Sequence, residues 1–245
     1  MTDAVVHHRP AEGQPALQLM LLFHGFGATP ADLATLAGFL ASAFPQALIV
    51  GIAAPTHSHP GEPDGRQWFS PHGLTDDDPE RLRPARVAEA MPAFEAAVRH
   101  WQRETGLGVD ATALVGFSQG AIMALESTQR TGPDGAPLPA LGGRTIALAG
   151  RFATLPLHPA IDTTFHLFHG KHDPVMPYRH AVQAAERLVA IGADVTADVL
   201  PFVQHEITAE MMELLVERLQ GHVPRRLWQE AMRAAGEDDG EPPRH

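Results

Sequence analysis

The sequence predicts an α/β fold in which a mainly parallel sheet carries helices on both faces. Two features of the 245-residue chain support this prediction. Short apolar runs alternate with segments of helical periodicity, and the runs lack a polar face, which is typical of strands buried on both sides. Because no repeat and no break in composition divides the chain, we expect one domain over residues 1–235 and a flexible polar tail over residues 236–245.

The first half of the chain contains two expected strands and two expected helices. The runs Leu17–Phe23 and Ala47–Ile52 predict buried strands. Between them, Thr29 is placed to cap a helix and Pro30 suits its first turn. A longer helix is expected over about residues 84–104, where Pro92 should kink or restart it.

The second half repeats this alternation. A strand at Thr112–Val115 should lead through a tight turn into a helix that ends near Gln129. The remaining expected strands are Arg144–Leu148, Thr164–Phe168 and Val195–Leu200, and the remaining expected helices are Tyr178–Ile191, Ile207–Leu219 and Arg225–Ala235.

Three segments stand outside this pattern or at its end. The Pro- and Gly-rich stretch Ala53–Arg83 is long enough to predict a functional or flexible loop, whereas Thr131–Gly143 follows a helix and should be a surface connection. The last helix should either pack on the protein's own sheet or form a dimer contact, so we expect a monomer or a homodimer. Its apolar face would consist of Leu227, Trp228, Ala231 and Met232.

The composition excludes several classes of partner. Eighteen Lys and Arg against 29 Asp and Glu give a net charge of −11, which disfavours binding to nucleic acid or to anionic membranes. The longest apolar run, Ala47–Ala54, is far shorter than a membrane span, so no membrane insertion is expected. The absence of Cys and of a signal-peptide pattern favours a cytoplasmic location.

The clearest chemical motif is G-x-S-x-G at residues 116–120, between an expected strand and an expected helix. This pattern is typical of the nucleophile turn of α/β-hydrolases, in which flanking glycines allow a tight strand-to-helix turn. Ser118 is therefore the predicted nucleophile. The alternative is a tight turn without a catalytic role.

A serine nucleophile needs a base that is oriented by an acid, and in this fold the acid and then the base follow the serine along the chain. Asp173 follows the expected strand at residues 164–168, and His205 follows the strand at 195–200. We therefore expect Asp173 as the triad acid and His205 as the base. A turn aspartate and a surface histidine are the alternatives.

The oxyanion of an acyl-transfer intermediate needs two backbone donors. We expect these to be the N–H of Gln119, after the nucleophile, and the N–H of Phe26 in the glycine-rich turn after the first strand. No metal-binding or nucleotide-binding pattern occurs, so neither a metal nor a cofactor is expected.

The motifs His24–Gly27, Gly116–Ala121, His169–Val175 and His205 resemble the phospholipase/carboxylesterase family of α/β-hydrolases, which includes the acyl-protein thioesterases. The resemblance runs from about Leu17 to Leu219. It implies a cofactor-free serine esterase with Ser118, Asp173 and His205 as triad, and a site with a minimal lid. Two positions depart from the family pattern: Ala28, where members often carry an acid, and Gln204, where a Gly often precedes the histidine.

We therefore expect a carboxylesterase that acts on small-molecule acyl esters or thioesters. A thioesterase or lysophospholipase for longer acyl chains is an alternative within the same chemistry, and a non-catalytic binding protein on a hydrolase scaffold is an alternative from another class. The expected substrate contacts are Trp68, Phe69, Arg151, Phe152 and Met176. Core packing is the alternative for the two residues of the long loop, and an exposed loop position is the alternative for the arginine.

Overall fold

The structure is a computed structural model that describes residues 3–59, 64–71, 79–227 and 232. Within this part of the chain, seven strands form one sheet in the order β1-β3-β2-β6-β7-β8-β9. All neighbouring pairs are parallel except β1 and β3, so the predicted mainly parallel α/β sheet is confirmed. The strands are β1 (Ala4–His8), β2 (Gln18–Phe23), β3 (Ala47–Ile52), β6 (Thr112–Phe117), β7 (Arg144–Leu148), β8 (Thr164–Gly170) and β9 (Asp194–Leu200).

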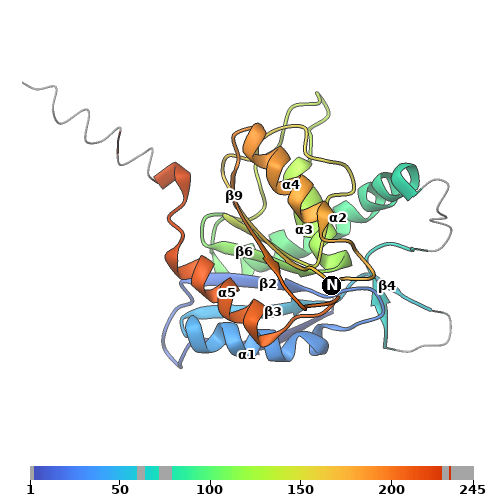
Figure 1. Ribbon diagram of the computed structural model, residues 1–245. Coiled ribbons are helices and arrows are strands. Elements are labelled where there is room, and N and C mark those ends of the chain that lie inside the picture. Colours follow the sequence, from blue (N-terminus) through green and yellow to red (C-terminus); the bar gives the residue numbers. More distant parts are fainter. Residues whose placement is uncertain (1–2, 60–63, 72–78, 228–231, 233–245) are drawn as a thin grey trace, which may run out of the picture.

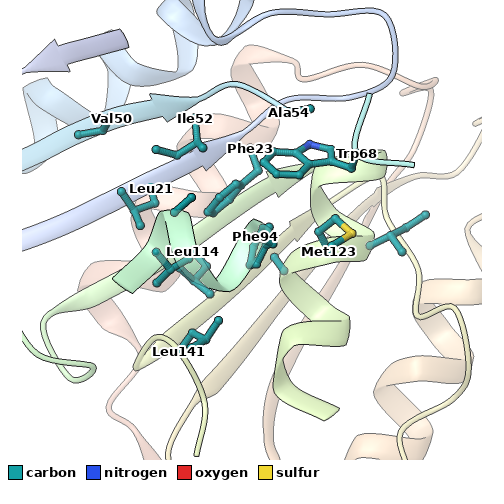
Figure 2. Packing of buried hydrophobic residues seen from close by; sticks show 14 of the residues in the cluster. Leu21, Phe23, Val50, Ile52, Ala54, Trp68, Phe94, Leu114, Met123 and Leu141 are labelled. Atoms are coloured by element: carbon teal, nitrogen blue, oxygen red, sulfur yellow. The ribbon is translucent and has the colours of Figure 1, made fainter. Parts of the chain in front are cut away.

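Helices cover both faces of the sheet, as the sequence predicted (Figure 1). On one face, α1 (Ala34–Ala43), preceded by the short helix η1 (Pro30–Leu33), lies beside α5 (Ala209–Gly221). On the other face lie α2 (Pro79–Thr105), α3 (Gln119–Glu126) with its extension η2 (Ser127–Gln129), and α4 (Arg179–Ala190). Figure 2 shows part of the core under α2 and α3, where Phe23, Trp68 and Phe94 meet.

The start of η1 follows the expected capping pattern. The backbone N–H and the hydroxyl of Thr29 donate to Asp32 Oδ2 over 2.7 and 2.8 Å. Pro30 occupies the first turn, where its missing N–H costs no hydrogen bond.

The edge strand β1 was not predicted. It pairs antiparallel with β3 and contains an irregularity between Val6 and His8. Its side chains are only partly buried, because an edge strand has one neighbour, so it lacks the continuous apolar run of the inner strands. His7 and His8 instead make side-chain hydrogen bonds to the carbonyls of Pro30 and Pro45.

The long loop after β3 is shorter than predicted. It contains the two-residue strands β4 (Thr56–His57) and β5 (Arg66–Gln67), and α2 already begins at Pro79. Pro92 does not restart α2, because the helix runs through Pro84 and Pro92 to Thr105, and a kink at Pro92 stays a prediction.

The C-terminal predictions fall mostly outside the described residues. Trp228, Ala231 and the tail 236–245 lie there, while Leu227 and Met232 are 48% and 67% exposed. The division into one domain and the oligomeric state therefore stay predictions. In the residues that the structure describes, no helix combines the length and apolar character that crossing a membrane requires.

Candidate active site

Ser118 lies in the turn between β6 and α3 with a φ of +53° and a ψ of −115°. Such a conformation is strained for a residue with a side chain, and the surrounding packing maintains it. A Cβ at Gly116 would collide with the carbonyl of Gly120, and a Cβ at Gly120 would collide with the carbonyl of Phe23. Close backbone contacts therefore require both flanking glycines of the motif. The Ser118 N–H also donates to Leu148 O over 3.0 Å, which ties the turn to β7.

The three predicted catalytic side chains form one chain of hydrogen bonds. His205 Nε2 lies 3.0 Å from Ser118 Oγ, and His205 Nδ1 lies 2.7 Å from Asp173 Oδ2. The side chain of His205 is 16% exposed and that of Asp173 is fully buried. A substrate can therefore reach the imidazole, whereas the carboxylate contacts only protein.

The loops that carry Asp173 and His205 are tied to each other at the carboxyl ends of β8 and β9. Lys171 N–H donates to Leu200 O over 2.8 Å, and His172 N–H donates to Val203 O over 3.0 Å. A Cβ at Gly170 would collide with the backbone of the His205 loop. This close approach keeps Asp173 and His205 at hydrogen-bond distance.

Backbone donors hold Asp173 in its ionised form. Oδ1 accepts hydrogen bonds from the N–H groups of Val175 (2.9 Å) and Met176 (2.7 Å). Burial acts to raise the pKa of Asp173, but the Met176 N–H and the His205 side chain outweigh it, so this pKa lies below the ordinary 3.8. The carboxylate stays charged and can orient the imidazole.

A second histidine contacts the same carboxylate and was not predicted. His169 Nε2 lies 2.6 Å from Met176 O and 3.2 Å from Asp173 Oδ2, and its side chain is fully buried. Burial lowers the pKa of His169, which favours a neutral ring whose Nε2–H donates to both oxygens. No sequence signal identifies this contact, because His169 ends a buried strand and meets Asp173 only through the way the following turn folds back.

The glycine-rich turn after β2 passes directly beside Ser118, the predicted nucleophile. A Cβ at Gly25 would lie only 3.2 Å from the Ser118 Cβ, which brings the backbone around Phe26 to the serine. His24 fixes this turn, because its Nδ1 lies 2.7 Å from Gly25 O and its Nε2 accepts from Ala54 N–H over 3.0 Å. The second predicted oxyanion donor is the backbone N–H of Gln119. Gln119 is the first residue of α3, and the first N–H groups of a helix have no acceptor within the helix.

The side chain of Gln119 has a separate structural role. Its Oε1 accepts from Trp68 N–H (3.1 Å) and its Nε2 donates to Phe69 O (2.9 Å). Trp68 and Phe69 are only 2% and 6% exposed, and the Trp68 indole donates to His24 O over 3.0 Å. Core packing thus accounts for both aromatic residues, and their contact with a substrate stays a prediction.

A cavity of about 380 Å³ adjoins the imidazole of His205. It lies between the turn after β2, the first helical turns after it, and α5. Its apolar lining includes Leu33, Leu36, Phe117, Ile207 and Met212. Helical periodicity cannot identify such a cavity in the sequence, because it does not show where two helices separate.

The other predicted substrate contacts, Arg151, Phe152 and Met176, do not line this cavity. Phe152 is 3% exposed and packs against Phe165, whereas Met176 is partly buried beside the Asp173 loop. Arg151 lines a second cavity, of about 360 Å³, together with His180. Across the described ranges, no group of three or more His, Asp or Glu side chains forms a candidate metal site.

A mainly parallel sheet with a strained serine turn, and with an acid and a histidine after later strands, defines the α/β-hydrolase class. The chain belongs to the phospholipase/carboxylesterase family, whose model matches residues 5–223. The resemblance predicted from the motifs is thereby confirmed.

Individual relatives agree with this assignment. The chain is 42% identical to esterase YpfH of Escherichia coli (strain K12) over 228 residues, which cover 92% of this chain and 93% of YpfH. The crystal structure of esterase PE8 superposes with a TM-score of 0.75 at 27% identity, covering 91% of this chain and 98% of PE8. That of Zea mays acyl-protein thioesterase 2 shares the fold, with a TM-score of 0.64 at 21% identity over 89% of this chain and 98% of the thioesterase. The protein is a hydrolase of the carboxylesterase type.

Proposed function

We propose that this enzyme hydrolyses carboxylic acyl esters through an acyl-enzyme on Ser118. The observation that carries the proposal is the continuous hydrogen-bond chain from Ser118 Oγ through His205 to Asp173. Asp173 accepts from His205 Nδ1–H, which leaves Nε2 unprotonated and able to accept the serine proton.

In the first half of the reaction, Ser118 Oγ attacks the acyl carbonyl carbon while His205 Nε2 takes its proton. The N–H groups of Phe26 and Gln119 stabilise the oxyanion, each contributing about 3 kcal/mol in the transition state. The bond to the leaving group then breaks, and His205 protonates the departing alcohol or thiol. In the second half, His205 removes a proton from water, which attacks the acyl-enzyme and releases the acid and free Ser118.

The cavity beside His205 supports an acyl substrate, because it lies next to the proposed base and offers the apolar side chains of Leu33, Leu36 and Phe117 among polar ones. Thioesters would pass through the same acyl-enzyme, so their cleavage is part of the same proposal. A small molecule is thus the proposed partner.

The test is hydrolysis of p-nitrophenyl esters from acetyl to palmitoyl. We expect turnover by the wild type and a loss of about 10⁶-fold in kcat in Ser118→Ala. Ser42→Ala, which alters an exposed serine on α1, is the matched control and should behave as wild type. A folded wild type that cleaves no ester, or a Ser118→Ala variant that keeps a tenth of the activity, would contradict the proposal.

A further inference from the structure

We propose that the cavity beside His205 binds the alcohol part of the ester substrate, and that this alcohol is apolar and carries no negative charge. The inference rests on the proposed function and names the substrate class of the same site. The cavity measures about 380 Å³, a volume within the range of small-molecule binding sites.

The cavity lies between the turn after β2, the start of α1 and the start of α5. These two helices lie side by side on one face of the sheet (Figure 1). Leu33 and Leu36 line the cavity from the start of α1, and Met212 lines it from the first turn of α5. Leu36 and Met212 belong to the buried core, so this part of the wall is well packed and keeps its shape.

Three lining residues connect the cavity to the proposed nucleophile. His205 is one of them, and its Nε2 lies 3.0 Å from Ser118 Oγ. Phe117 directly precedes the serine, and its ring centroid lies 5.1 Å from that of His205. Gly25 is the third, and a Cβ there would lie 3.2 Å from the Ser118 Cβ. A substrate that is bonded to Ser118 Oγ can therefore extend directly into the cavity.

The proposed mechanism decides which part of the ester faces the imidazole. The attacked carbon carries Ser118 Oγ, the oxyanion, the acyl chain and the leaving oxygen. When the bond from this carbon to the leaving oxygen breaks, the proton on His205 Nε2 moves to that oxygen, so the two atoms must be within hydrogen-bond distance. The oxyanion instead faces the backbone N–H groups of Phe26 and Gln119. The alcohol is thus the part of the substrate that must lie against the imidazole, and the cavity begins there.

The side chains of the wall favour an apolar alcohol. Leu33, Leu36 and Phe117 present aliphatic and aromatic groups to the cavity. Ala28 adds only a methyl group, at a position where members of the family often carry an acid. Burial of one methylene group against such a wall improves binding about fourfold.

The carboxylates of the lining disfavour an anionic alcohol. Asp32 and Glu206 line the cavity, and its described lining residues include no arginine or lysine. Burial lowers the pKa of His24, so this ring is neutral near pH 7, and its Nε2 accepts from Ala54 N–H. A carboxylate on the alcohol would therefore meet charges of its own sign, whereas an uncharged alcohol would not.

The experiment compares isomeric esters and follows acid release by pH-stat titration. Hexyl acetate and ethyl hexanoate contain the same atoms, but only hexyl acetate places the long chain on the alcohol. Ethyl acetate is the short reference for both, and 6-acetoxyhexanoate adds a carboxylate to the end of the hexyl chain. We expect kcat/KM for hexyl acetate to exceed that for ethyl acetate by about tenfold or more, because burial of each added methylene is worth about fourfold. The carboxylated ester should react more slowly than hexyl acetate, and Glu206→Gln should narrow that difference.

Thr35→Trp tests the location, because this exposed residue of α1 lines the cavity and the larger side chain would fill part of it. The ratio of kcat/KM for hexyl acetate to that for ethyl acetate should fall about tenfold, whereas the ratio for ethyl hexanoate to ethyl acetate should not. Ser42→Trp adds the same indole at an exposed position near the other end of α1, and should keep both wild-type ratios. Thermal unfolding of each variant separates misfolding from a change in specificity.

Equal kcat/KM values for hexyl acetate and ethyl acetate would overturn the alcohol site, and so would wild-type ratios in Thr35→Trp. An advantage for ethyl hexanoate that Thr35→Trp removes would also overturn it, because the cavity would then bind the acyl chain. Equal rates for 6-acetoxyhexanoate and hexyl acetate would overturn the exclusion of anionic alcohols. Each of these results leaves the proposed function intact if turnover depends on Ser118. Absence of Ser118-dependent turnover on all four esters would contradict the proposed function itself.

Discussion

Replacing Gln119 with Met should destabilise the protein, because two buried backbone groups about 50 residues away in the sequence would lose their hydrogen-bond partner. Gln119 is 6% exposed, and its amide satisfies the Trp68 N–H and the Phe69 carbonyl at 3.1 and 2.9 Å. Methionine has a similar length but can replace neither hydrogen bond. Each buried group left without a partner costs about 1–3 kcal/mol, so the free energy of unfolding should fall by about 4 kcal/mol.

The assay is thermal unfolding followed by circular dichroism. For a domain of this size, 1 kcal/mol corresponds to a Tm shift of about 2–4 °C, so a decrease of roughly 8–16 °C is expected. Gln46→Met, which changes an exposed glutamine, is the matched control and should leave the Tm unchanged. A Tm of Gln119→Met within 2 °C of the wild type would refute the reasoning that the Gln119 amide stabilises the loop that contains Trp68 and Phe69.

Gln119→Glu tests the same two hydrogen bonds through the pH dependence of stability. A carboxylate can still accept from Trp68 N–H, but it would face the Phe69 carbonyl with no proton to donate. The folded state should therefore raise the pKa of the introduced carboxyl, and the variant should gain stability relative to wild type as the pH falls and the group becomes protonated. A destabilisation independent of pH would show that the amide at this position does not donate.

Three further predictions concern the site and its supports. Asp173→Asn keeps an oxygen for the two backbone donors but disturbs the tautomer of His205, so kcat should fall about 10⁴-fold in steady-state assays, and a loss under tenfold would contradict the role of the acid. Burial raises the pKa of Glu126 from 4.5 to about 7, so its contribution to stability is complete below pH 4.5 and is lost as the pH rises through 7. Relative to Glu126→Gln, the wild type should lose up to about 3 kcal/mol between pH 4.5 and 8.5 in urea titrations, whereas parallel curves would contradict the burial of this carboxyl. Gly120→Ala should prevent folding or abolish activity, because its Cβ collides with the carbonyl of Phe23, and a stable, active variant would show that the turn can open.

The inner part of the fold was predictable because its strands are buried on both faces. Residues 19–23 of the run Leu17–Phe23 and all of Ala47–Ile52 are buried, as is typical of strands in a parallel sheet that is covered on both faces. The edge strand Ala4–His8 has one neighbour and carries two polar histidines, so the same criterion missed it. The strands at 56–57 and 66–67 are too short to show any periodicity.

The proposed catalytic residues could be located from chain order, since the acid and the base each follow a strand of the parallel sheet. The side chains that hold these residues and their loops in place could not be located in this way. The contact of Gln119 with Trp68 joins residues 51 positions apart, and the position of His169 beside Asp173 depends on how the loop folds back. Core packing was the alternative for Trp68, and the structure places this side chain in the core, while its contact with a substrate stays a prediction.

Covalent labelling with a fluorophosphonate tests the central claim most directly, because such a probe reacts with a serine only when a neighbouring base activates it. We predict that intact mass spectrometry finds one adduct per wild-type chain, that peptide mapping places it on Ser118, and that Ser118→Ala carries none. Labelling of Asp173→Asn should be much slower at equal probe concentration. A folded wild type that stays unlabelled, or an adduct that persists in Ser118→Ala, would contradict the account.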